Sequence, residues 1–185
     1  VSFFLEDGYP SEALIVYLMT IANSNFEEWL FANNYKNIES FEFSFDKMSL
    51  EGALFDITKL QFFAKEILAR KNKTEMLQMA LEYSSKYDAK LYELINRDQK
   101  YFEEIMNIER EKENPRKDYY KFGGIIDTID FFYDDLYSDL IVNHHPFNEK
   151  FSKDQIIEVL TDLNNNLSLE QDEQSWFAHM KEIGG

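Results

Sequence analysis

The chain has 185 residues and a mass of 22.1 kDa, which is enough for one good hydrophobic core or two small ones. Hydrophobic residues make up 44% of it, which excludes a disordered chain, and the absence of Cys excludes disulfides and thiolate metal sites. A net charge of −16 argues against a nucleic-acid partner unless the basic residues are clustered. No apolar run approaches the roughly 18 residues of a membrane span, so we expect a cytoplasmic protein without a membrane partner.

The predicted elements begin with a helix whose first position is Pro10, because proline suits the start of a helix. Asn25 is the expected cap of a short helix that follows. Apolar residues of the first helix recur at helical spacing and predict one buried stripe, formed by Leu14, Tyr17, Leu18 and Ile21.

The pattern changes from helical to alternating between residues 39 and 55. Phe41, Phe43 and Phe45 recur with period 2, which predicts either a short strand or an extended segment lying over a core. Asp56 is then expected to cap a longer helix. The apolar face of that helix consists of Leu60, Phe63, Ala64, Ile67 and Leu68.

Capping residues divide the rest of the chain into further short helices. Thr74, Asp88 and Asp98 are expected to begin three of them, and Ser152 with Gln155 forms a capping-box pattern before another. Only six Gly and three Pro interrupt the chain, which suits helices better than a turn-rich β protein. The patterns together predict an all-α fold, a bundle or cage of about eight to ten short helices.

No pattern of residues in the chain indicates catalysis or metal binding. A Gly-rich phosphate loop and a nucleophile elbow are both absent from the sequence. His144 and His145 are adjacent in a predicted loop without a third ligand at a diagnostic spacing, so we interpret them as surface histidines. We therefore expect no catalytic residue and no metal or cofactor site in these residues.

Residues 107–122 contain the most informative cluster of charge. Five of the 19 Lys and Arg residues lie there, and Pro115 predicts that they occupy a break between helices. Tyr119 and Tyr120 follow, so the stretch has the composition of a site for a phosphate and a stacked base. The alternative interpretation is a solvated loop, because charged clusters usually face water.

Basic residues are also concentrated in the middle third of the chain. Residues 62–121 carry 13 basic and 12 acidic groups, whereas residues 122–185 carry 3 and 13. A basic face can act locally despite distant acidic groups, because the Debye length is about 8 Å at physiological salt. The strongly acidic last third favours a different hypothesis, an all-α domain that binds a basic protein and no RNA.

Six stretches of the chain together form a specific pattern, although none of them would suffice alone. They are EDGYPSEA (residues 6–13), YLMTIANSNFEEW (17–29), MSLEGALFDITKL (48–60), YD (87–88), NIER (107–110) and PRKD (115–118). These stretches resemble bacterial glutamyl-tRNA synthetases, in the form found in clostridia and their relatives. Residue 51 is Glu where that form often has serine, and the sequence begins in mid-pattern, as a piece of a longer chain would.

The resemblance implies the tRNA-binding half of the enzyme, with two parts. Residues 1–65 are similar to the stem-contacting part, and residues 66–185 to the α-helical anticodon-binding domain. The catalytic half, which uses ATP and Mg²⁺ to attach glutamate to tRNA, would lie upstream in the same chain. The fragment alone would then perform neither step, and tRNA and the upstream catalytic domain would be its partners.

Basic residues of the middle third are the expected contacts to RNA under this resemblance. Arginine binds a phosphate or a splayed base through its planar fork, so Arg110 and Arg116 are the first candidates for anticodon contact. Tyr119 and Tyr120 are candidates for base stacking. The remaining candidates are Lys65, Arg70, Lys71, Lys73, Lys117 and Lys121.

Overall fold

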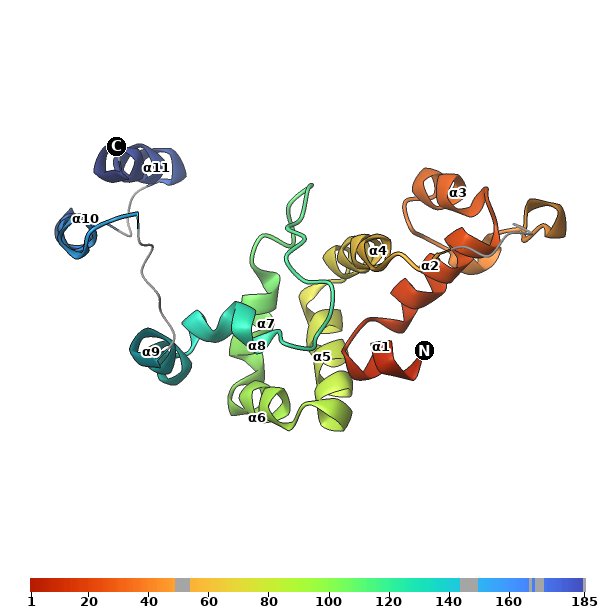
Figure 1. The fold of residues 1–185 in the computed structure, drawn as a ribbon, viewed down its shortest axis with the longest axis horizontal. Coiled ribbons are helices and arrows are strands. Elements are labelled where there is room, and N and C mark those ends of the chain that lie inside the picture. The colour runs from red at the N-terminus through yellow and green to blue at the C-terminus, as the bar shows by residue number, and fades with distance from the viewer. Residues whose placement is uncertain (49–53, 144–149, 167, 169–171, 185) are drawn as a thin grey trace. The chain divides into compact units, whose positions relative to one another are not determined.

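The computed structural model describes all residues except 49–53, 144–149, 167, 169–171 and 185 (Figure 1). The chain divides into two compact units, Val1–Tyr137 and Ser138–Gly185, and each is described by itself. The described part contains helices and no strand, which confirms the prediction of an all-α fold. Nine helices in that part have seven residues or more, in agreement with the eight to ten short helices expected.

The first unit holds eight helices, and a ninth crosses its boundary. The helices are α1 (Ser2–Glu6), α2 (Ser11–Ala22), α3 (Phe26–Ala32), α4 (Ile57–Ala69), α5 (Lys73–Tyr87), α6 (Ala89–Arg97), α7 (Gln99–Asn107), α8 (Ile126–Ile129) and α9 (Asp134–Asn143). Single 3₁₀ turns lie at η1 (Ile38–Ser40), η2 (Phe45–Lys47) and η3 (Asp130–Phe132). The second unit holds α10 (Lys153–Asn166) and α11 (Glu173–Gly184).

The first hydrophobic cluster lies where α2 and α4 pack together, with α3 against α2. Every residue of the predicted apolar face of α4 is buried, and Asp56 accepts hydrogen bonds from the amides of Thr58 and Lys59, as expected for its cap. On α2 the prediction that Leu18 is buried is wrong, since its side chain is 49% exposed. The buried face of the helix includes Ala13 and Val16 instead. The helix also begins one residue later than expected, with Pro10 as its N-cap.

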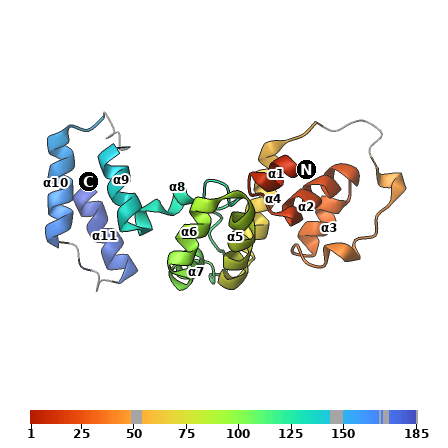
Figure 2. The ribbon, with the colours of Figure 1, turned by 90° about the horizontal axis from the view of Figure 1, so that it is seen from below.

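The second cluster joins α5, α6 and α7, which lie side by side in Figure 2. Asp88 and Asp98 cap α6 and α7 by accepting hydrogen bonds from backbone amides, as predicted. Thr74 is not the cap of α5. That position is Asn72, whose side chain and that of Glu75 each bind the other's backbone amide in a capping box.

The segment after η1 is extended and forms no strand. Phe41 and Ser44 have extended backbone angles, and Asn23 holds the segment by donating from Nδ2 to the Ser44 carbonyl at 2.7 Å. Phe41 packs on the first cluster, whereas Phe45 is 82% exposed. Of the two alternatives, the extended segment over a core is correct for residues 41–44, where Phe41 reaches that core. The expected segment is wrong at residues 38–40 and 45–47, which form 3₁₀ turns, and residues 49–53 lie outside the described residues.

Two glycines allow the start of the chain to cross the segment before α8. The Phe122 amide donates to the Gly8 carbonyl at 3.0 Å. A Cβ on Gly8 would lie 2.4 Å from the Gly123 nitrogen, and one on Gly123 would lie 2.2 Å from the Asp7 carbonyl oxygen. Gly8 also has a φ of +89°, in the region that favours glycine. This crossing fixes residues 121–124 against the N-terminal turn.

The second unit has little core of its own. Helices α10 and α11 pack against each other, yet none of their described side chains is buried. The capping box predicted at the start of α10 is present, with Ser152 and Gln155 exchanging hydrogen bonds. His144 and His145 lie outside the described residues, so the structure leaves their interpretation as it was.

The residues that the structure describes contain no helix that is both long enough and apolar enough to cross a membrane. They also contain no group of three or more metal-binding side chains.

Candidate nucleic-acid interface

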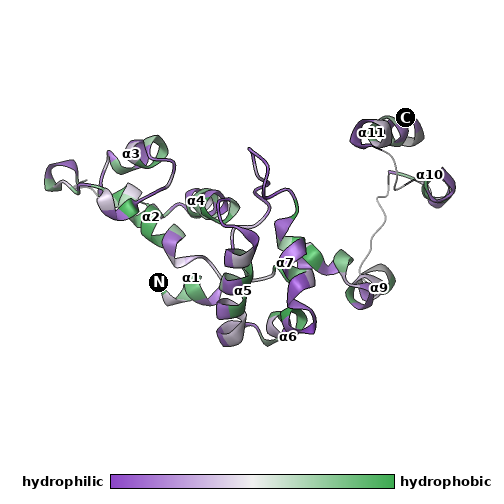
Figure 3. Cartoon of the chain, turned by 180° about the vertical axis from the view of Figure 1, so that it is seen from behind, coloured by the Kyte–Doolittle hydropathy of each residue, from purple (hydrophilic) through white to green (hydrophobic). Residues whose placement is uncertain are grey.

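The loop between α7 and α8 carries most of the predicted contacts and is largely hydrophilic (Figure 3). It lacks regular structure between Ile108 and Lys121, consistent with the helix break predicted at Pro115. Glu109 begins it with a φ of +56°. Its side chains fix it to α4, to α7 and to the N-terminal turn.

Arg110 holds the loop against the ends of two helices. Its Nε donates to the Met106 carbonyl at 2.6 Å, and its Nη1 donates to the carbonyls of Leu68 and Lys71 at 2.6 and 3.1 Å. Burial lowers the pKa of the guanidinium, although Tyr119 and Asp118 oppose that shift. The side chain therefore binds one carbonyl in the last turn of α7 and two at and just beyond the C-terminal end of α4. The sequence did not indicate that Arg110 binds main-chain carbonyls.

Replacing Arg110 with Lys is expected to lower the free energy of unfolding by about 2 kcal/mol, because one ammonium cannot serve three carbonyls in the geometry of a guanidinium fork. Urea denaturation followed by Trp fluorescence measures the effect. An unchanged midpoint would show that these three hydrogen bonds contribute little.

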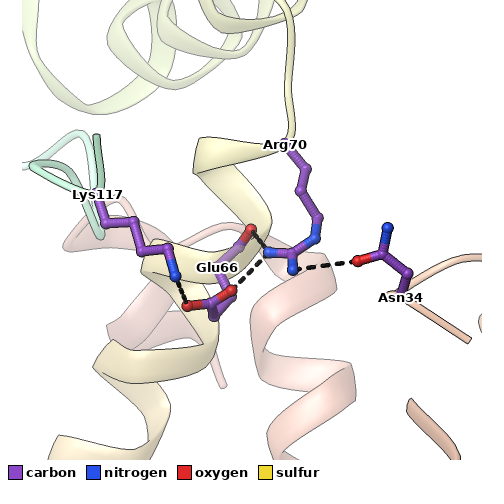
Figure 4. A network of polar contacts seen from close by, with 4 residues as sticks. All are labelled: Asn34, Glu66, Arg70 and Lys117. Atoms are coloured by element: carbon purple, nitrogen blue, oxygen red, sulfur yellow. Dashed lines mark hydrogen bonds and ion pairs between the residues drawn. The ribbon is translucent and has the colours of Figure 1, made fainter. Parts of the chain in front are cut away.

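Glu66 of α4 joins two of the predicted basic residues (Figure 4). Arg70 donates from Nη1 to Oε2 at 2.7 Å, and the Lys117 ammonium pairs with Oε1. The Glu66 side chain is only 9% exposed, against 34% for Arg70 and 48% for Lys117. Burial alone would raise the pKa of the Glu66 carboxyl, but the hydrogen bonds from Lys117 and Arg70 outweigh it and lower the pKa. Glu66 is therefore a carboxylate held between two cations.

Tyr119 and Tyr120 are neighbours in sequence but pack into different clusters. Tyr119 packs against the second cluster, where burial raises the pKa of its hydroxyl. Tyr120 packs against the first cluster, with its ring centroid 5.8 Å from that of Tyr9. The ammonium groups of Lys65 and Lys121 lie 5.9 and 5.8 Å from the Tyr120 ring centroid. Both tyrosines therefore have structural contacts beside any role in stacking.

The other predicted basic residues form ion pairs with carboxylates. Lys121 pairs with Asp7 at 2.6 Å; burial alone would lower its pKa, but Asp7 outweighs burial and raises it. Arg116 binds Asp118 through two nitrogens, at 2.9 and 3.2 Å. Lys71 pairs with Glu12, and Lys73 with Glu104. Within the part that the structure describes, Lys65 alone of the predicted basic residues contacts neither a carboxylate nor a carbonyl.

Two grooves lie on the loop and its neighbours. The aromatic groove, of about 420 Å³, is lined by Lys65, Ile105, Ile108, Arg110, Arg116, Lys117, Asp118, Tyr119, Thr128, Phe131 and Phe132. The polar groove, of about 670 Å³, is lined mainly by α4, residues 34–36 and the loop, and it shares Arg110 and Lys117 with the first. Its charged residues are Glu12, Lys36, Glu66, Arg70, Lys71, Glu75, Arg110, Glu113 and Lys117.

The structure thus brings five of the predicted residues to one place and separates others from it. The five in the aromatic groove are Lys65, Arg110, Arg116, Lys117 and Tyr119. Arg70 and Lys71 line the polar groove, and Tyr120 and Lys121 lie near Lys65 without lining either groove. Lys73 lines neither groove.

Sequence reasoning missed Phe131 and Glu66 as residues of this region. Phe131 is 55% exposed and lines the aromatic groove, with its ring centroid 4.3 Å from that of Phe132. Ile129 and Phe132 are apolar residues at helical spacing, and Phe131 lies outside that spacing. An aromatic residue outside the helical spacing is the sequence feature that could have indicated an exposed ring here. Glu66 gave no such signal, because Lys117 is 51 residues away in sequence.

Comparison with known proteins identifies the relatives of the chain. It is 32% identical, over 99% of its length, to the glutamate–tRNA ligase of Acetivibrio thermocellus and 30% identical, over its whole length, to that of Clostridium beijerinckii. It is 29% identical, over 99% of its length, to the enzyme of Clostridium perfringens. The chain spans about a third of the length of these curated relatives.

No family model matches the chain, and no solved structure matches it either. The relatives bear out the resemblance found in the sequence motifs, because they agree on one enzyme and cover nearly every residue of the chain. The chain is therefore similar, over nearly all of its length, to a C-terminal part of bacterial glutamate–tRNA ligases of the clostridial type.

Proposed function

We propose that this chain is the tRNA-binding portion of a glutamate–tRNA ligase. The observation that carries the proposal is the charge of the aromatic groove, which has four basic residues and a single carboxylate in a chain of net charge −16. Such a concentration of cations beside aromatic rings suits a phosphate backbone with unstacked bases.

The residues of the aromatic groove have different expected roles. Arg116 and Lys117 are 55% and 48% exposed, so phosphates can reach both side chains. Arg116 can exchange the exposed Asp118 for a phosphate at little cost, whereas Lys117 has to leave the Glu66 carboxylate, which is only 9% exposed. Phe131 presents an exposed ring on which a base can stack. Arg110 is held by three carbonyls, so we assign it the role of fixing the loop and shaping the groove, not of reading a base.

Further features of the enzyme are proposed on the strength of the relatives. Residues 1–65 would contact the tRNA stem and residues 66–185 the anticodon region. A catalytic part of the same protein would bind ATP and Mg²⁺ and attach glutamate to the tRNA in the cytoplasm. The relatives carry the name glutamate–tRNA ligase, which supports these assignments.

Binding of glutamate tRNA in a gel-shift titration tests the proposal. We expect a complex at low salt whose affinity falls as salt rises, with a slope of about −0.7 to −0.9 in the double-logarithmic plot for each phosphate contact. Absence of any complex at low salt would reject RNA binding and would favour the acidic protein-interaction domain. A transcript of the same length with a scrambled sequence is the control for non-specific binding.

A further inference from the structure

The contacts of Glu66 suggest a role beyond bracing the loop. Each of its two carboxylate oxygens binds a different cation, Oε2 on Arg70 and Oε1 on Lys117. One cation comes from the same helix and the other from the loop, so the carboxylate bridges two elements. Lys117 lines both grooves, which places this bridge between them.

A phosphodiester would offer the same two cations an equivalent pair of oxygens. Its two unesterified oxygens share one negative charge, as the oxygens of a carboxylate do, and guanidinium and ammonium groups bind both anions with charge-assisted hydrogen bonds. The cations are the exposed members of the network, whereas the carboxylate is buried below them. An RNA backbone therefore has access to the cations without having to reach Glu66.

We propose that Glu66 is an internal stand-in for an RNA phosphate, which occupies Arg70 and Lys117 in the free protein and releases at least one of them when RNA binds. The inference rests on the proposed binding of tRNA. Glu66 then limits the affinity of the grooves for any polyanion, because each new phosphate contact replaces an existing ion pair. An RNA that places only a few phosphates against these cations therefore gains little binding free energy from the exchange.

Lys117 is the cation that we expect Glu66 to release. Its side chain is the more exposed of the two, and within the described part of the chain Glu66 is its one hydrogen-bond and ion-pair partner. Arg70 is held more firmly, since it also donates to the Glu66 carbonyl, contacts Asn34 and lies 4.1 Å from the Tyr35 ring centroid. A released Lys117 can turn into the aromatic groove.

The test is Glu66→Gln in the full chain, with tRNA affinity measured by filter binding over a range of salt. Glutamine keeps the shape of the side chain and removes its charge. We expect affinity to rise by about tenfold at low salt and the salt slope to steepen by about 0.7 to 1.8, since one or two cations become free to bind phosphates. The control is Glu27→Gln, which removes the same charge from an ion pair with Lys59 outside both grooves and should leave the slope unchanged.

Weaker binding by Glu66→Gln, or an affinity and slope equal to those of the wild type, would overturn the inference and leave Glu66 as a brace for the loop. If the wild type itself fails to bind tRNA, the proposed function fails and not merely the role of Glu66. If Glu66→Gln does not fold, ¹⁵N NMR of the lysine and arginine side chains of the wild type gives the answer. The Lys117 or Arg70 signals must shift on addition of tRNA, and unmoved signals would reject the exchange.

Discussion

Replacing Gly8 with Ala is expected to lower the free energy of unfolding of the first unit by about 2 to 4 kcal/mol, the sum of a backbone cost and an overpacking cost. The backbone cost arises because Gly8 has a φ of +89°, which residues with a Cβ rarely adopt. The overpacking cost arises because the new methyl group would lie 2.4 Å from the Gly123 nitrogen, a backbone atom. Urea denaturation followed by the fluorescence of Trp29 measures the loss.

Two neighbouring glycines separate the two costs. Gly124 has a φ of +75° but open space, with its nearest neighbour at 3.9 Å, so Gly124→Ala should cost only about 1 kcal/mol of backbone strain. Gly123 lacks a positive φ but would place a Cβ 2.2 Å from the Asp7 carbonyl oxygen, so Gly123→Ala reports overpacking alone. A loss for Gly8→Ala no larger than that for Gly124→Ala would mean that the crossing yields easily.

Replacing both Arg116 and Lys117 with Glu is expected to weaken tRNA binding by about 100-fold at low salt, because two charge-assisted contacts to phosphates become two repulsions. The salt slope should also fall by about 1.4 to 1.8, since two phosphate contacts are lost. Both side chains line the aromatic groove, and both are about half exposed. Filter binding with the wild type and the variant in parallel measures the change.

The controls separate a lost contact from a changed total charge or a damaged fold. Lys90 and Lys100 are exposed residues of α6 and α7 outside both grooves, so their double change to Glu alters net charge equally and should leave most of the affinity. Lys117→Glu places a second carboxylate beside Glu66, so circular dichroism must show intact helices. Arg116→Glu alone avoids that repulsion and should keep about half of the effect on the logarithm of affinity. Equal affinities for the double variant and the wild type would reject this groove as the tRNA site.

The helices of the first unit were largely predictable because their signals are local. Spacing of apolar residues identified the buried face of α4, and Asp56, Asp88 and Asp98 each cap the helix expected of them. The cap of α5 was placed at Thr74 instead of Asn72, although Asn72 is followed three residues later by Glu75 in the pattern of a capping box. The exposure of Leu18 could not be predicted, because most residues of α2 are apolar and their pattern does not show which face of the helix is buried.

The partners of the predicted site residues were not predictable from local pattern. Counting charges along residues 107–122 correctly located a basic loop, but it could not show that Lys117 meets Glu66 or that Lys121 meets Asp7, 114 residues away. The carbonyls that hold Arg110 are main-chain atoms, which leave no trace in the identity of a residue. Ion pairing between distant segments is a property of the fold, and so the contacts that decide which cations are available needed the structure.

The opposite packing of Tyr119 and Tyr120 has a consequence for how the first unit comes apart. The two residues are consecutive in sequence, and each packs against a different hydrophobic cluster. Helix α4 makes the same connection a second time, since Ile67 belongs to one cluster and Leu68 to the other. Unfolding of either cluster therefore removes packing contacts from the other. Heat should unfold residues 1–137 in one cooperative transition.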